Sequence, residues 1–150
     1  MKALFEKLYT FQRHYNLQMV EHFELYGGAV PERDIPLFSH VLNAHQIWNA
    51  RILGLEPFKV FDVHPVAAMR QIVEDNHKNS LRILEECDLS QRFHYRNSQG
   101  EDFSNLIEEI LFHVVNHTTF FHYFFPFPIA KYALSPHFWL AALTKWTDTI

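Results

Sequence analysis

Two histidines within residues 111–117 have the spacing of metal ligands. His113 and His117 lie four residues apart, with Asn116 before the second. On a helix such side chains project from the same side, about 40° apart at about 100° per residue. Imidazole nitrogens are common ligands of divalent transition metals. With Ile110 at the centre of the core-facing side, the same geometry predicts that His117 points inward and His113 toward the edge.

A third candidate ligand, His40, lies on an earlier segment with helical periodicity. His40 falls at the edge of the apolar stripe of that segment, where an imidazole could face the interior. A partly buried histidine can also be a hydrogen-bonded structural residue. His40 alone therefore supports either a metal-binding or a structural role.

Four long segments must position these histidines. In each one apolar residues recur at three- and four-residue steps, which predicts amphipathic helices. The predicted ranges are residues 3–26, 34–53 and 65–86, and a fourth helix that begins at Asp102 or Ser104. Gly54 is expected to stop the second helix. The core-facing stripes include Leu4, Phe11, Met19 and Phe23 in the first segment and Met69, Val73, Leu81 and Leu84 in the third.

A different pattern precedes the fourth helix. Residues 93–103 alternate aromatic and polar side chains around a turn-forming Asn-Ser-Gln-Gly sequence. This alternation predicts a short hairpin or extended excursion. The connections between the other segments are short, so the sequence predicts an all-α fold, a four-helix bundle with this excursion before the fourth helix.

The composition changes after His117, where the only formal charges are Lys131, Lys145 and Asp148. Pro126 is expected to end the fourth helix nearby. A short last helix is expected around residues 138–146. The aromatic segment should be buried, either across the bundle or against another subunit.

Composition limits the classes of function. The chain has 150 residues and is 48% hydrophobic, which fits one packed domain over residues 1–150. The net charge is -4, and no basic stripe suggests nucleic acid as a partner. No apolar run suits a membrane span or a signal peptide. Cys87 is the only cysteine, which excludes an intrachain disulfide and predicts a cytoplasmic location.

A set of residues in fixed order carries a family resemblance. They are His40, Trp48, Arg51, Ile52, Gly54, Pro57 and Phe58, and later His113, Asn116 and His117. Over most of residues 1–119 this pattern resembles the DinB/YfiT-like superfamily. The resemblance implies a four-helix bundle, often dimeric, that holds a divalent metal, nickel or zinc, on three histidines. One ligand comes from the second helix, and two come from the fourth helix, four residues apart.

Carried over residue by residue, the resemblance implies His40 and His117 as ligands. The next ligand is expected at position 121, which is Phe121 here and cannot ligate. Three outcomes follow for the third ligand. His122 could substitute if the helix bulges or ends early. His113 could serve one turn earlier. Alternatively, the site is lost and Phe121 fills the core.

The resemblance implies a metal-dependent enzyme, such as a thiol S-transferase or a related isomerase. The metal would bind a low-molecular-weight thiol and lower its pKa. The expected partners are a second copy of the chain, in a homodimer, and a small thiol substrate. The alternative is a non-catalytic dimeric helical bundle that keeps the fold and has lost the metal site. The sequence assigns no catalytic residue.

Overall fold

The fold is known from a computed structural model that describes residues 1–97 and 100–122, with side chains up to Phe120. Its elements are α1 (Lys2–Tyr26), a 3-10 turn η1 (Gly27–Ala29), α2 (Asp34–Leu53), α3 (Val66–Glu86), β1 (Arg92–Arg96), β2 (Asp102–Leu106) and α4 (Ile107–His122). The predictions for Pro126, for residues 138–146 and for burial of the aromatic segment fall outside the described residues, as do the side chains of Phe121 and His122.

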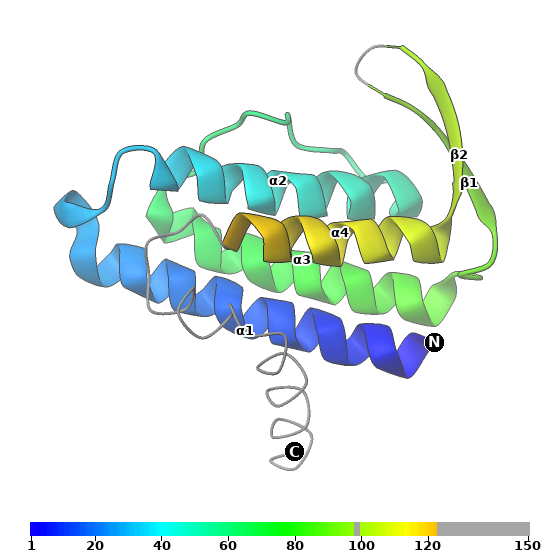
Figure 1. Cartoon of the computed structure of the whole chain (residues 1–150), viewed down its shortest axis with the longest axis horizontal. Coiled ribbons are helices and arrows are strands. Elements are labelled where there is room, and N and C mark those ends of the chain that lie inside the picture. Colours follow the sequence, from blue (N-terminus) through cyan, green and yellow to red (C-terminus); the bar gives the residue numbers. More distant parts are fainter. Residues whose placement is uncertain (98–99, 123–150) are drawn as a thin grey trace.

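The described chain is mostly helical, with four helices and one two-stranded sheet (Figure 1). α1 packs against α3 and α4, and α2 packs against the same two helices. The hairpin of β1 and β2 extends from the end where α4 begins (Figure 1). This arrangement confirms the four predicted helices and the extended excursion before the fourth. No helix in the described part is both long and apolar enough to cross a lipid bilayer.

The end of α2 and the start of α3 follow from local backbone chemistry. Gly54 adopts the left-handed conformation, with φ 68°, and its N–H donates to the carbonyl of Ala50. A side chain at this conformation would be strained by roughly 1–2 kcal/mol, so glycine ends α2 as predicted. Pro65 lies one residue before α3 with an extended backbone and serves as its N-cap. The predicted start of the third helix is therefore displaced by one residue.

The predicted start of the fourth helix is wrong. Asp102 and Ser104 belong to β2, because the antiparallel register pairs Arg96 with Asp102 and continues to the end of the strand. α4 begins only after β2 ends. Its first turn is capped from within the helix, since the Glu109 carboxylate accepts a 2.8 Å hydrogen bond from the backbone N–H of Leu106. A carboxylate there also suits the positive end of the helix dipole.

Two apolar clusters form the core. One contains Phe5, Tyr9, Ile83, Leu84, Leu89, Ile107, Leu111, Val114 and Val115. The other contains Met19, Val20, Phe23, Phe38, Val41, Leu42, Met69 and Val73. Most of the predicted stripe is confirmed. Leu4 and Leu81 are exposed instead, because Phe5 and Ile83 occupy the inward positions. Each large side chain buried in this way stabilises the fold by about 1.5–3 kcal/mol.

A layer of buried polar residues lies between the two clusters along α2 and α3. His45 and Asn49 of α2 converge on the hydroxyl of Ser80 in α3, at 2.7 and 3.1 Å. Asn76 donates to the carbonyl of Leu42 at 3.0 Å. Buried polar groups need such partners, so this layer fixes how α2 and α3 face each other.

Candidate metal site

The packing of α2 against α4 brings two of the predicted ligands, His40 and His117, together, with the alternative third ligand His113 beside them. The ring centroids of His40 and His117 lie 5.3 Å apart. His113 lies one turn earlier on α4, with its ring centroid 5.9 Å from that of His117. His122 was the other candidate, and its side chain lies outside the described residues. The structure therefore supplies one histidine pair between helices and a third histidine beside it.

The separation of the His40 and His117 ring centroids is compatible with shared coordination. If a metal lies about 2.0–2.1 Å from each nitrogen with a tetrahedral angle between the bonds, the two ring centroids lie roughly 5 Å apart. The 5.3 Å between His40 and His117 agrees with this value. The 5.9 Å between His113 and His117 is wider. The pair across the helices is therefore the better-placed pair of ligands.

Burial distinguishes the two histidines of α4. His117 is half-buried against the neighbouring helix, and His113 is exposed. This confirms the prediction that His117 points inward and His113 toward the edge. Burial, together with the smaller effect of positive charge at His40 and His113, lowers the pKa of His117 to about 4. A neutral imidazole keeps the nitrogen lone pair that a metal needs.

The ring of His40 is oriented by the loop that follows α2. Its Nδ1 lies 3.3 Å from the carbonyl oxygen of Val60. A carbonyl only accepts hydrogen bonds, so this contact requires the proton on Nδ1 and leaves the lone pair on Nε2. Carbonyl partners of this kind commonly orient metal-binding histidines. The ring of Phe61 stacks on the same imidazole, with centroids 6.2 Å apart.

Asn43 holds this loop against α2. Its amide donates to the carbonyls of Val60 and Asp62, at 3.3 and 2.7 Å. Its Oδ1 lies 2.6 Å from Nε2 of His64, at the far end of the loop. Asn43 is fully buried. Sequence reasoning missed this residue, although an asparagine in an apolar stripe of a helix is itself a sign of a buried polar contact.

Among the side chains that the structure describes, no group of three or more His, Cys, Asp or Glu residues is placed to hold a metal ion. His40 and His117 thus stand as a two-histidine pair. Two protein ligands leave room for a third group, and both His113 and His122 stay predictions for that role.

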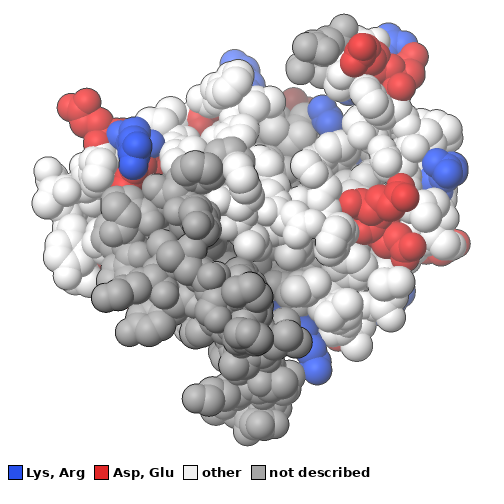
Figure 2. Space-filling view, in the orientation of Figure 1, with Lys and Arg blue, Asp and Glu red and all other residues white. Residues whose placement is uncertain are grey.

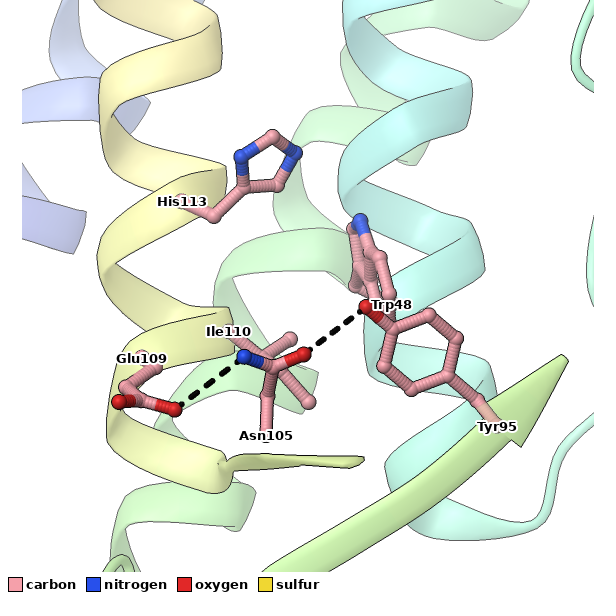
Figure 3. A pocket seen from close by; sticks show the side chains of 6 residues that line it. All are labelled: Trp48, Tyr95, Asn105, Glu109, Ile110 and His113. Atoms are coloured by element: carbon pink, nitrogen blue, oxygen red, sulfur yellow. Dashed lines mark hydrogen bonds between the residues drawn. The ribbon is translucent and has the colours of Figure 1, made fainter. Parts of the chain in front are cut away.

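A pocket of about 210 Å³ adjoins the histidines, between α2, α4 and the hairpin (Figure 3). It is lined by Trp48, Tyr95, Asn105, Glu109, Ile110 and His113. The ring of His113 extends from α4 toward α2 (Figure 3). Its centroid lies 6.2 Å from that of Trp48. The pocket and the histidine pair therefore share His113 as a common boundary.

A hydrogen-bonded chain forms one side of the pocket. The phenol of Tyr95 donates to Oδ1 of Asn105 at 3.0 Å, and the amide of Asn105 donates to Glu109 at 3.3 Å (Figure 3). The hydrogen bond from the N–H of Leu106 lowers the pKa of Glu109, and the bond from Asn105 lowers it further. Glu109 is therefore an ionised carboxylate at neutral pH.

The aromatic side of the pocket carries a cation of the protein itself. Trp48 and Tyr95 meet edge to face, with centroids 4.8 Å apart. The guanidinium carbon of Arg51 lies 4.9 Å from the centroid of Trp48 and 5.9 Å from that of Tyr95. Both distances are within the range of cation–π attraction.

On the face seen in Figure 2, the described Lys and Arg side chains stand apart rather than forming one basic patch.

Fold and site together define a mostly helical protein with a histidine pair between α2 and α4 and an aromatic-walled pocket beside it. No protein-family model, curated protein or solved structure matches this chain. The function is therefore inferred from the geometry of these residues and from the resemblance in the sequence.

Proposed function

We propose that this chain binds a divalent metal ion, nickel or zinc, between His40 and His117, in a single DinB/YfiT-like four-helix-bundle domain. The observation that carries the proposal is the 5.3 Å separation of the two ring centroids across α2 and α4. The half-buried position of His117 and the Val60 carbonyl at Nδ1 of His40 support it further.

The two histidines would hold the ion by one ring nitrogen each, which for His40 is Nε2. A third protein ligand would come from His122 or His113, and the remaining position would stay open to water or a thiol. When bound, the ion would supply a Lewis acid that lowers the pKa of a coordinated thiol. Metal-dependent thiol S-transfer is the class of reaction that this arrangement favours.

Metal analysis of purified protein without a histidine tag tests the proposal. We expect about one nickel or zinc per chain after loading and removal of free metal. His40→Ala and His117→Ala should each abolish tight binding. His94→Ala is a matched control, because His94 is exposed on β1. Equal binding by the parent chain and both site variants would overturn the proposal.

The same assay identifies the third ligand. If His122 contributes, His122→Ala should weaken binding strongly and His113→Ala should have little effect. The reverse result would assign the role to His113. Equal and small effects of both substitutions would mean that the ion is held by His40 and His117 with solvent alone.

The second candidate function is a non-catalytic dimeric bundle without metal. The observation that favours it is Phe121, which stands where the resemblance places the third histidine. Sedimentation analysis of the parent chain with and without nickel separates the two candidates. A dimer that neither takes up metal nor is stabilised by metal would support the second candidate.

A further inference from the structure

The pocket between α2, α4 and the hairpin has the chemistry of a small-molecule site. Its volume of about 210 Å³ lies below the roughly 300–1,000 Å³ of pockets for drug-sized ligands. It therefore suits a single ring with a short substituent. Two aromatic side chains, Trp48 and Tyr95, and the aliphatic Ile110 offer apolar surface to such a ring.

The polar groups on the hairpin and α4 side are mostly acceptors. The Tyr95 hydroxyl already donates its proton to Asn105, so its oxygen can only accept from a ligand. One N–H of Asn105 is engaged by Glu109. Glu109 belongs to the lining of the pocket, where its carboxylate is exposed to solvent and adds a full negative charge at the mouth. A ligand with hydrogen-bond donors can use the Tyr95 oxygen and the Glu109 carboxylate on this side, and a positive charge is favoured there.

The aromatic side also attracts positive charge. Arg51 already lies over the rings of Trp48 and Tyr95 at cation–π distance. Arg51 occupies part of this aromatic surface, so a ligand's own charged group fits best on the Glu109 side. The ligand's ring then lies against the aromatic surface that Arg51 leaves open.

We propose that this pocket binds a small primary ammonium compound with an apolar ring, its ammonium group at Glu109 and its ring against Trp48 and Tyr95. Because His113 borders both the pocket and the histidine pair, a bound ligand would lie next to the metal. The assignment of this ligand as a substrate rests on the proposed metal function, whereas the binding of the ligand to the pocket does not.

Ligand-observed NMR titration of metal-free protein tests the ligand class. The probes are benzylamine, benzyl alcohol and benzoate, which share a ring and differ in charge. We expect saturable binding of benzylamine, with the alcohol about two- to fivefold weaker, because Glu109 is exposed and solvent screens its charge. Benzoate should not bind. Preferential binding of benzoate would assign the pocket to Arg51 and overturn the proposal, as would equal binding of all three probes.

Substitution of the carboxylate locates the ammonium group. Glu109→Gln should weaken benzylamine about two- to fivefold and leave benzyl alcohol unchanged, as expected for an exposed ion pair. Glu108→Gln is the matched control, since Glu108 also lies in the first turn of α4 and is not a lining residue. Equal benzylamine affinity in both variants would overturn the proposal. If Glu109→Gln fails to fold, the order of the three probes on the parent chain still decides.

Nickel loading separates the two proposals. Benzylamine binding by the metal-free chain that is retained in His40→Ala supports the pocket independently of the metal. Metal uptake without benzylamine binding would overturn the pocket proposal and leave the metal proposal intact. Benzylamine binding without metal uptake would overturn the metal proposal and leave the pocket proposal intact.

Discussion

The imidazoles of His40 and His117 lie with their ring centroids 5.3 Å apart, although one belongs to α2 and the other to α4. Their proximity comes from the packing of these two helices. Because the helices fix both backbones, the pair is largely preorganised for a shared ligand, and an ion between them would link the two helices.

Metal binding should therefore stabilise the fold. An ion that binds only the folded chain stabilises it by about 2.7 kcal/mol at one hundred times its dissociation constant. We expect a rise in melting temperature when nickel or zinc is added to the parent chain. The rise should disappear in His40→Ala and His117→Ala and persist in His94→Ala. A rise of the same size in all four proteins would point to metal binding elsewhere.

The loop that orients His40 should affect metal affinity without supplying a ligand. Asn43→Ala removes the amide that holds the carbonyls of Val60 and Asp62. We expect a loss of about 1–3 kcal/mol in unfolding free energy and of about tenfold or more in nickel affinity. Urea denaturation and calorimetric titration measure the two quantities.

Gln46→Ala is the control for Asn43. Gln46 also joins α2 to this loop, through the N–H of Phe58 and the carbonyl of Glu56. These contacts lie at the start of the loop, away from Val60. We expect reduced stability with nearly unchanged nickel affinity. Equal losses of affinity in the two variants would mean that general loosening of the loop, and not the position of Val60, affects His40.

Buried His45 predicts a pH dependence of stability. Burial, together with the smaller effect of positive charge at His77, lowers its pKa from 6.5 to about 3. Below pH 6.5 the His45 imidazole is protonated in the unfolded chain, whereas it stays neutral in the folded chain. The contribution of His45 to the free energy of unfolding is therefore fully present above pH 6.5. It falls by up to about 1.4 kcal/mol per pH unit as the pH is lowered toward 3.

Urea denaturation at pH 7.5 and 5.5 checks this dependence. His45→Gln should show a smaller loss of unfolding free energy between the two values than the parent chain. His94→Gln, at an exposed position, should lose as much as the parent. An unchanged loss in His45→Gln would show that other groups cause the acid sensitivity.

The hydroxyl of Tyr9 joins α1 to α4. It is buried and donates to the carbonyl of Leu111 at 3.1 Å. Tyr9→Phe keeps the ring in the core and removes the hydrogen bond to Leu111, so we expect a loss of about 1 kcal/mol in unfolding free energy. Tyr26→Phe at an exposed position should cost much less. A neutral Tyr9→Phe would mean that the ring alone accounts for the role of this residue.

The helices could be predicted because their apolar periodicity and the glycine at position 54 are local properties of the sequence. The start of α4 could not, because Asp102 and Ser104 look like capping residues yet pair with β1. Cross-strand register decides this, and it depends on contacts between segments. The exposure of Leu4 has a related cause, since an apolar residue next to a stripe matches the pattern almost as well as its neighbour.

The histidines of the site were predictable and the pocket was not. The spacing of His113 and His117 follows from helical geometry, whereas their proximity to His40 was implied by the family resemblance. Tyr95 and Asn105 reach the pocket only because the hairpin folds beside α2 and α4. No periodicity in the sequence predicts that Tyr95 and Asn105 lie beside these two helices.

The most direct test of the central claim is the position of the metal. A nickel-loaded crystal of the tag-free chain, measured on both sides of the nickel absorption edge, locates the ion by its anomalous scattering. We expect one peak per chain between the rings of His40 and His117, about 2.0–2.1 Å from a nitrogen of each. A nickel-loaded crystal with no peak between these rings, or with its peaks at other histidines, would contradict the account.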